Sequence, residues 1–272
     1  MVDAAHLPVL NVSDVFDGRR DPPIASWSYF RVAAPVPPLR PFVECFWIRA
    51  IAGADPHNDR RILPDGRMDL VWISGLSVLV AGPQSRYTER PDRFPLLAVG
   101  AHFHPGGAPS LLGLPASDFV DGHVRLETID QRLADRLDAR LEGARDHREA
   151  FAAFDAELLR RLDGFVPANA AVQAGVRLLD NGSLTVAGLA AQLYISERQL
   201  RRRFAERVGY GPKTLQRIFR FQRLVAEVRS GRLELAAAAA AAGYAHQAHL
   251  SRESVRLAGL SPRELAGWIG PR

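Results

Sequence analysis

Residues 184–208, LTVAGLAAQLYISERQLRRRFAERV, decide how the carboxyl-terminal part of the chain folds. Thr185 is a suitable N-cap for a short helix of small residues. After a turn, Ser196 and Gln199 have the spacing of a capping box at the start of a second helix. A short helix, a tight turn and an amphipathic helix predict a helix-turn-helix unit. The apolar face of the second helix is predicted to consist of Leu200, Phe204 and Val208.

The other faces of this second helix carry arginine and glutamine with few acidic residues. A charge run of this kind is ordinarily a solvated helix face. Here the helix start is anchored and the pattern recurs further along the chain, which favours insertion into a major groove of DNA. The polar residues concerned are Arg198, Gln199, Arg201, Arg202 and Arg203.

The same pattern recurs about 50 residues further on. Residues 233–242 predict an alanine-rich helix, and Gly243 is suited to end it in the left-handed conformation. A second turn then leads into a helix over residues 246–258. Between the two units, residues 212–230 predict a long helix with Pro212 in its first turn. Such a helix spans roughly 27 Å, close to the ~34 Å between successive major grooves on one face of DNA.

From about residue 170 to 268, the sequence resembles the C-terminal DNA-binding domain of AraC/XylS-type bacterial transcription regulators. The first unit carries the resemblance through LAAQLYISERQLRRRF, and the second through GYAHQAHLSR followed by GLSPREL. The resemblance implies that both recognition helices bind promoter DNA. By motif position it assigns contacts with base edges to Arg198, Arg201, Arg202, Gln247, Ser251 and Arg252. Contacts with phosphate are expected from Ser196, Gln199, Arg203, Lys213, Arg217, His249 and Arg256.

Three positions depart from the family pattern. Tyr194 stands where a turn glycine is common, which predicts a different turn in the first unit. Ser254 replaces a usual core aromatic residue, and alanines over residues 236–242 replace larger side chains. These departures predict a loosely packed second unit that contributes less to binding than the first.

The charge of the chain is unevenly distributed. The 272 residues carry a formal net charge of +5, yet residues 166–272 hold 16 basic and 7 acidic residues, a net charge of +9, which leaves −4 for residues 1–165. A basic part joined to an acidic part indicates a polyanionic partner for the basic part alone. DNA fits this better than a membrane surface, since no helix pairs a broad Trp/Phe/Leu face with a basic one.

Composition and length also bound the class of protein. The chain is long enough for two domains, and its hydrophobic content of 47% is that of a globular protein. No apolar run approaches the ~18 residues of a membrane span. The single cysteine, Cys45, has no partner for an internal disulfide, so we expect a reducing, cytoplasmic setting.

An acidic front part precedes the helical part. We expect an extended lead-in over residues 1–26 and a β-rich domain over residues 27–126. The strands expected in it cover residues 61–63, 68–73, 77–81 and 96–103, with short helical turns at 108–112 and 116–120 and a hairpin turn at Pro64-Asp65-Gly66. This part resembles an uncharacterised version of the cupin-like sensor domains common in the family, through LPDGRMDLVW (residues 63–72) and GAHFHPGGAPSLLGLPASDFVD (residues 100–121). The predicted fold class is α+β, with a small N-terminal β-barrel or sandwich and an all-α C-terminal domain over residues 168–270.

A pair of helices is expected between these parts, over residues 127–165, with a boundary at residues 167–169. The first helix carries a narrow apolar stripe, which either packs on the strand domain or forms a dimer seam. Its residues are Ile129, Leu133, Leu137 and Leu141, and the second helix carries Phe151, Phe154, Leu158 and Leu159.

The front part holds three features with potential chemistry. His102 and His104 have the spacing of metal ligands, but no further ligand follows closely, and paired histidines on one face of the barrel are the alternative. Residues 105–107 lead into a helix start that suits an anion. Cys45, expected to share a strand face with apolar residues, is predicted to be a buried and inert thiol rather than an alkyl acceptor. We predict no metal site, cofactor or catalytic residue.

The sequence therefore predicts a sequence-specific regulator of transcription initiation in bacteria that responds to an effector through its front domain. Its expected partners are double-stranded promoter DNA, RNA polymerase, a small-molecule effector and, through the leucine stripe, a second copy of the chain. Two alternatives stay open. The front domain is instead a metal-dependent β-barrel enzyme with an accessory helical domain, or the helical part is a protein-interaction module.

Overall fold

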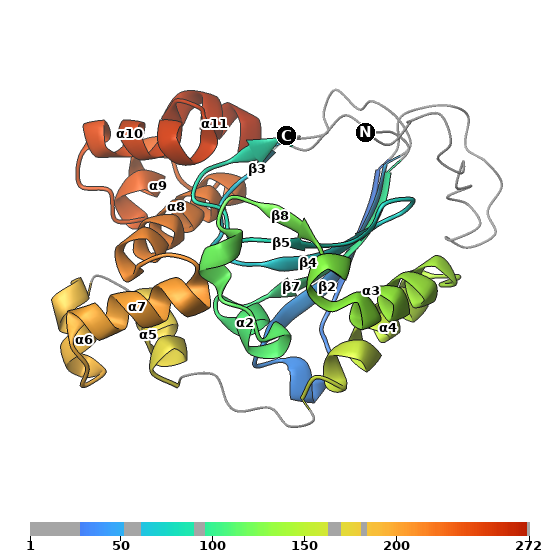
Figure 1. The fold of residues 1–272 in the computed structure, drawn as a ribbon. Helices are drawn as coiled ribbons and strands as arrows, with labels where there is room; N and C mark the ends of the chain where they lie inside the picture. Colours follow the sequence, from blue (N-terminus) through green and yellow to red (C-terminus); the bar gives the residue numbers. More distant parts are fainter. Residues whose placement is uncertain (1–27, 52–60, 90–95, 163–169, 181–183, 271–272) are drawn as a thin grey trace.

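The computed structural model describes residues 28–51, 61–89, 96–162, 170–180 and 184–270, with side chains from residue 30 onward. The lead-in expected over residues 1–26 and the boundary expected at 167–169 lie outside these ranges. The described residues build two hydrophobic cores, one within residues 39–158 and one within residues 172–269. The two cores correspond to a strand-rich front domain and an all-helical back domain, which lie side by side in Figure 1.

The front domain is built on one antiparallel sheet in the order β1-β2-β7-β4-β5-β8, beside a separate pair, β3 and β6. The α+β fold class is confirmed. In the described residues the sheet is open, with β1 and β8 at its edges, and does not close into a barrel. The strands are β1 (Ser28–Ala33), β2 (Val43–Ile51), β3 (Arg61–Ile62), β4 (Asp69–Ile73), β5 (Ser77–Ala81), β6 (Thr88–Glu89), β7 (Leu96–Phe103) and β8 (His123–Arg125).

A helix pair covers one face of this sheet, as Figure 1 shows. It consists of α3 (Glu127–Glu142) and α4 (His147–Leu159). Alternate residues of β4 and β5 face the pair and are buried, as the two-residue period of a strand requires. Leu133, Leu137 and Leu141 of the leucine stripe are at most 4% exposed in this core. The stripe therefore packs on the strand domain, and the alternative that these leucines form a dimer seam is wrong.

Two local predictions for the front domain are corrected by the strand pairing. Pro64-Asp65-Gly66 is not a hairpin turn, because β3 pairs with β6 whereas β4 pairs with β5 and β7. The register of β2 shifts between Val43 and Cys45. Cys45 therefore shares the half-buried face of the sheet with Trp47 but not with the buried Val43. Burial still raises the pKa of its thiol, so the prediction of a poorly reactive cysteine keeps physical support.

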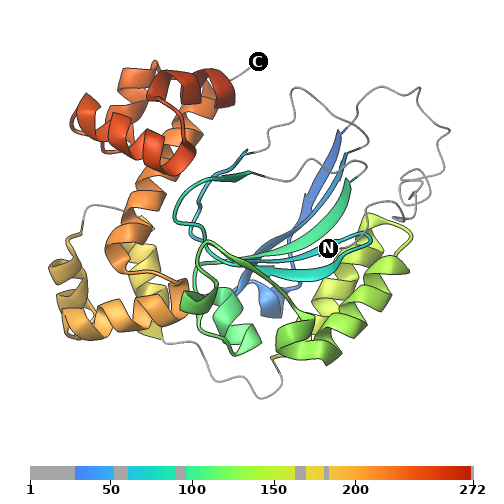
Figure 2. The ribbon, with the colours of Figure 1, turned by 45° about the horizontal axis from the view of Figure 1, so that its top comes forward.

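The helices predicted over residues 212–230, 233–242 and 246–258 of the back domain are present, and each of their bounds agrees to within two residues. Figure 2 shows α8 joining the lower unit, α5 to α7, to the upper unit, α9 to α11. None of the described helices is long and apolar enough to cross a membrane. The helices are α5 (Ala170–Asp180), α6 (Val186–Gln192), α7 (Glu197–Val208), α8 (Pro212–Ser230), α9 (Leu235–Ala241), α10 (Gln247–Ala258) and α11 (Pro262–Ile269).

Three short helical segments lie in the described part of the front domain, and two of them contact the back domain. Segment η2 (Pro37–Leu39) precedes β2, α2 (Gly107–Leu112) follows β7, and η3 (Ala116–Phe119) follows α2. Both α2 and η3 contact α7 of the back domain. The first helix-turn-helix unit therefore rests on the front domain.

Candidate DNA-binding surface

The first unit begins each of its helices with a side-chain cap. The Gly188 amide donates to Thr185 Oγ1 over 3.0 Å at the start of α6. At the start of α7 the Gln199 amide donates to Ser196 Oγ over 3.2 Å, and the Ser196 amide donates to Gln199 Oε1 over 3.0 Å. The expected capping box is thus present, and it fixes where α7 begins. Ser196 and Gln199, which are also expected to contact phosphate, are exposed beside this box.

The turn between these helices keeps a glycine-like backbone despite its tyrosine. Tyr194 has a φ of 53°, in the left-handed region that L side chains rarely adopt. Its side chain is 95% exposed, so no packing compensates for the strained backbone. Tyr194 thus adopts a backbone conformation that suits the usual glycine, and the chain still turns between α6 and α7. The replacement of glycine changes the side chain and adds backbone strain, but it does not change the path of the turn.

The polar face of α7 is open to solvent. Arg198, Arg201 and Arg202 are exposed, whereas Arg203 is half-buried. Arg201 pairs with Glu197, and the Arg202 guanidinium lies 3.9 Å from Glu206, both one turn away on the same helix. Exposed pairs of this spacing contribute only about 0.3–0.5 kcal/mol, so phosphate or a base edge can replace them at little cost.

In the second unit, a buried hydrogen bond takes the place of a larger apolar side chain in the core. Ser254 is fully buried, and its hydroxyl donates to the Leu260 carbonyl over 2.7 Å. On the outer side of α10, Gln247, Arg252 and Arg256 are exposed and Ser251 is half-buried. His249 is half-buried, with its ring 5.3 Å from that of Tyr244.

The two residues of the linker helix that are expected to contact phosphate differ in their exposure. Lys213 is exposed in the first turn of α8. Arg217 is half-buried, and its Nε lies 3.0 Å from the Glu253 carboxylate of α10. This ion pair ties α8 to the second recognition helix, so Arg217 supports the unit in this structure. Glu253 was not singled out from the sequence, because nothing in its spacing separates a buried acid from a solvated one.

The structure thus gathers the expected residues on two helices of the same domain. Both α7 and α10 pack on α8, and each presents its polar side outward. Exposed positive charge on paired recognition helices suits neutralisation of phosphates, with base edges read by the side chains that enter the grooves.

A separate polar cluster lies on the other face of the front sheet. The ring of His102 lies between two carboxylates, with Nδ1 2.9 Å from Asp69 and Nε2 3.2 Å from Asp65. Trp47 Nε1 donates to Asp69 over 3.0 Å. Burial lowers the pKa of His102, but the charge of Asp69 and the hydrogen bonds to both carboxylates outweigh it and raise this pKa to about 11. His102 is therefore an imidazolium held by two acids.

Neither metal nor anion chemistry gains support from this region. Among the described residues, no three His, Cys, Asp or Glu side chains are placed to hold a metal ion. The Gly107 amide donates to the His104 carbonyl over 2.7 Å, and a Cβ at Gly107 would lie 2.2 Å from the Phe42 carbonyl oxygen. Backbone therefore covers the helix start at residues 105–107, which argues against the possibility that it holds an anion.

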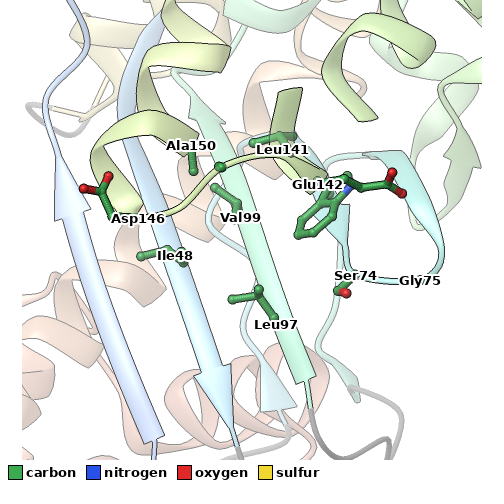
Figure 3. A pocket seen from close by; sticks show the side chains of 11 residues that line it. Ile48, Ser74, Gly75, Leu97, Val99, Leu141, Glu142, Asp146 and Ala150 are labelled. Atoms are coloured by element: carbon green, nitrogen blue, oxygen red, sulfur yellow. The ribbon is translucent and has the colours of Figure 1, made fainter. Parts of the chain in front are cut away.

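A pocket of about 270 Å³ opens between the sheet and the corner where α3 meets α4 (Figure 3). Its wall is largely apolar, and two acidic side chains, Glu142 and Asp146, come from the corner. Asp146 also caps α4 by accepting from the Arg148 and Glu149 amides. The apolar wall includes Ile48, Trp72, Leu97, Val99, Leu141 and Ala150.

Comparison with known proteins gives two family matches and a set of distant structural likenesses. Residues 189–267 match a helix-turn-helix domain, and residues 31–125 match a domain of unknown function (DUF6597). ToxT from Vibrio cholerae O395 is 11% identical with a TM-score of 0.44, over 90% of this chain and 98% of that one. ToxT from Vibrio cholerae strain SCE256 bound to an unsaturated fatty acid is 10% identical with a TM-score of 0.43, over 93% and 100% of the two chains. No curated protein matches.

The helix-turn-helix match runs from within α6 to within α11, and the unknown-function match runs from within β1 to the end of β8. The family resemblance found in the sequence is confirmed on these residues. The chain therefore joins an AraC-type helix-turn-helix domain at its carboxyl end to a front domain of the DUF6597 family.

Proposed function

We propose that this protein is a sequence-specific DNA-binding regulator of transcription initiation in bacteria. The observation that carries the proposal is the pair of recognition helices, α7 and α10, whose outer faces expose arginine side chains, with the start of α7 fixed by a capping box. Base readout is assigned to Arg198, Arg201, Arg202, Gln247, Ser251 and Arg252. Phosphate contacts are assigned to Ser196, Gln199, Arg203, Lys213, His249 and Arg256. Arg217, from which a phosphate contact is also expected, is engaged by Glu253 and is assigned to the support of α10.

Selection of duplex DNA from a random-sequence library by the full-length protein tests this function. Enrichment of one motif made of two half-sites is expected, with an affinity that falls steeply as salt rises because phosphate contacts release counterions. Loss of binding to every duplex at low salt, by protein that is still folded, contradicts the proposal. That outcome supports the alternative of a protein-interaction module.

The front domain is proposed to sense a small molecule in the pocket beside α3 and α4. An apolar wall suits an apolar ligand body, and the acidic corner suits a cationic or hydrogen-bond-donating group. Val99→Trp fills the pocket, whereas Leu114→Trp introduces the same side chain at a half-buried site outside its lining. A compound that changes DNA affinity of the wild type and of Leu114→Trp, but not of Val99→Trp, supports this site. A response that survives in Val99→Trp contradicts it.

RNA polymerase is the proposed protein partner, and the cytoplasm, where bacterial DNA resides, is the proposed location. The enzyme alternative gains no support from the described residues, which hold no clustered metal ligands. A second copy of the chain stays a proposed partner without an assigned surface. Sedimentation of the free protein and of its DNA complex measures the number of copies bound.

A further inference from the structure

One short segment of the front domain contacts both helix-turn-helix units. Residues 83–87, here the bridge segment, begin with Pro83 and end with Tyr87. Pro83 packs on Gly209, the C-cap of α7, and a Cβ at Gly209 would lie 2.5 Å from Pro83 Cγ. Tyr87 packs on Gly259, the C-cap of α10, and a Cβ at Gly259 would lie 2.5 Å from the Tyr87 ring. The bridge segment thus contacts both recognition helices, and in each case the contact is at the C-cap glycine.

Glycine meets two demands at both C-caps. Gly209 and Gly259 have φ values of 94° and 69°, in the left-handed region by which helices commonly end. Neither has a side chain to hold the front domain away, so Pro83 and Tyr87 lie directly on the backbone. The position in space of the carboxyl end of each recognition helix therefore depends on where the bridge segment lies.

The bridge segment is itself held in place by the front domain. The Ser85 amide and hydroxyl both donate to the Asp121 carboxylate over 2.6 Å. The Asp121 amide in turn donates to the Pro83 carbonyl over 3.2 Å. At the other end, the Arg61 guanidinium lies 5.5 Å from the centre of the Tyr87 ring. These contacts fix both ends of the segment.

The linker helix is held by the same domain. Gln222 Nε2 of α8 donates to the Pro64 carbonyl over 2.7 Å, and Gly66 lies beside Leu215 of α8. Both units pack on α8, which runs between them in Figure 2. A single helix allows bending along its length. The bridge segment adds a second connection between the two units.

We propose that the bridge segment sets the distance and rotation between α7 and α10, and with them the half-site spacing that the protein accepts on DNA. The proposal rests on the DNA-binding function proposed above. A change of one base pair turns a half-site by about 35° and moves it by about 3.4 Å, so two fixed helices accept one spacing best. Contact at the C-caps leaves Arg198 and Gln247, in the first turns of α7 and α10, free for DNA.

The test uses the full-length protein and the duplex selected by the wild type. Affinity is measured on that duplex, on duplexes with one base pair added or removed between half-sites, and on the isolated half-site of the first unit. The wild type is expected to lose about tenfold in affinity when the spacing changes by one base pair. Tyr87→Ala is expected to reduce this loss to less than about threefold. Tyr87→Phe keeps the ring on Gly259 and is expected to behave as the wild type.

A second variant separates the bridge from the Tyr87 contact. Asp121→Gly suits the φ of 58° at this position and removes the carboxylate that holds Ser85. It is expected to relax spacing discrimination, whereas the exposed neighbour Ser117→Ala is not. Melting curves of all variants show that they are folded.

The possible outcomes distinguish failure of this inference from failure of the proposed DNA-binding function. A wild type that binds no DNA contradicts the proposed function. Unchanged spacing discrimination in both Tyr87→Ala and Asp121→Gly overturns the role of the bridge segment while the function stands. An equal loss of affinity on the isolated half-site and on every two-half-site duplex overturns it as well, because the segment then supports one helix rather than their spacing.

Discussion

Arg217 of the linker helix and Glu253 of the second recognition helix form an ion pair with 3.0 Å between Nε and Oε1, and their side chains are only 19% and 10% exposed. The other oxygen of Glu253 is buried without a hydrogen-bond partner among the described residues. The pair thus joins two elements in a poorly solvated place, where a lone charge is costly.

Truncation of Arg217 is therefore expected to destabilise the back domain. Arg217→Ala leaves the Glu253 carboxylate buried without its counter-charge and is expected to lower the free energy of unfolding by about 3 kcal/mol. Urea unfolding measures this change, with the exposed Lys213→Ala as a charge-matched control expected to change it by less than about 0.5 kcal/mol. If Arg217→Ala keeps full stability and loses only DNA affinity, its role is phosphate contact instead.

Arg202 gives the most direct test of base readout. Arg202→Ala removes an exposed guanidinium from the outer face of α7 and is expected to cost about 1–3 kcal/mol of binding at the selected site. It is also expected to relax the preference at one base position, as a repeated library selection measures. Arg132→Ala, an equal loss of charge at an exposed site on α3, is the control. Equal losses on specific and random duplex assign Arg202 to phosphate.

Lys213 is expected to act on all DNA alike. It is the only lysine in the sequence, and it is exposed at the start of α8. Lys213→Ala is expected to weaken specific and random duplexes equally and to reduce the slope of log affinity against log salt by about 1. Titrations at several salt concentrations measure that slope. A selective loss on the specific duplex is inconsistent with a phosphate contact.

The strained turn at Tyr194 predicts a stabilising substitution. A left-handed backbone costs an L residue about 1–2 kcal/mol, and glycine avoids this strain while adding about 0.5–1 kcal/mol of chain entropy to be lost on folding. Since the tyrosine ring is 95% exposed, little packing is lost. Tyr194→Gly is expected to raise the free energy of unfolding by about 0.5–1 kcal/mol, whereas Tyr194→Ala keeps the strain and gains nothing. Denaturant unfolding of both variants checks the difference.

The His102 cluster predicts a pH-dependent contribution to stability. The pKa of His102 is raised from an ordinary 6.5 to about 11 in the folded protein. Its stabilisation is therefore complete below pH 6.5 and is lost progressively as pH rises toward 11. His102→Gln is expected to lower the free energy of unfolding by about 3 kcal/mol at pH 6, and by much less at pH 10. A pH-independent difference shows that His102 contributes by packing alone.

The helical domain was predictable because its signals are local. The capping box of Ser196 and Gln199 and the four-residue spacing of Leu200 and Phe204 act within one helix, so the printed sequence contains them directly. The outer faces of α7 and α10 follow from the same period. Arg217 shows the limit of this reasoning, because its partner Glu253 lies 36 residues away and their meeting depends on how two helices cross.

The front domain was less predictable because its pairing is distant. Four expected strand regions are present, but β2 and β8 have no strong turn signals at both ends, and β7 lies between β2 and β4. The register shift between Val43 and Cys45 takes Val43 off the face that Cys45 shares with Trp47, which strict alternation does not predict. The bridge segment carries no motif at all, since its contacts are with glycines more than 120 residues further along the chain.

The chain holds one thiol and one ε-amine, and they lie in different domains. Cys45 is half-buried in β2, and Lys213 is exposed on α8. A maleimide dye and an amine-reactive dye therefore attach at two known places without any substitution, apart from amine labelling at the N-terminus. The shielded thiol reacts slowly and calls for long incubation. Energy transfer between the dyes then follows the separation of the domains in the free protein, since a dye on Lys213 removes the charge assigned to phosphate.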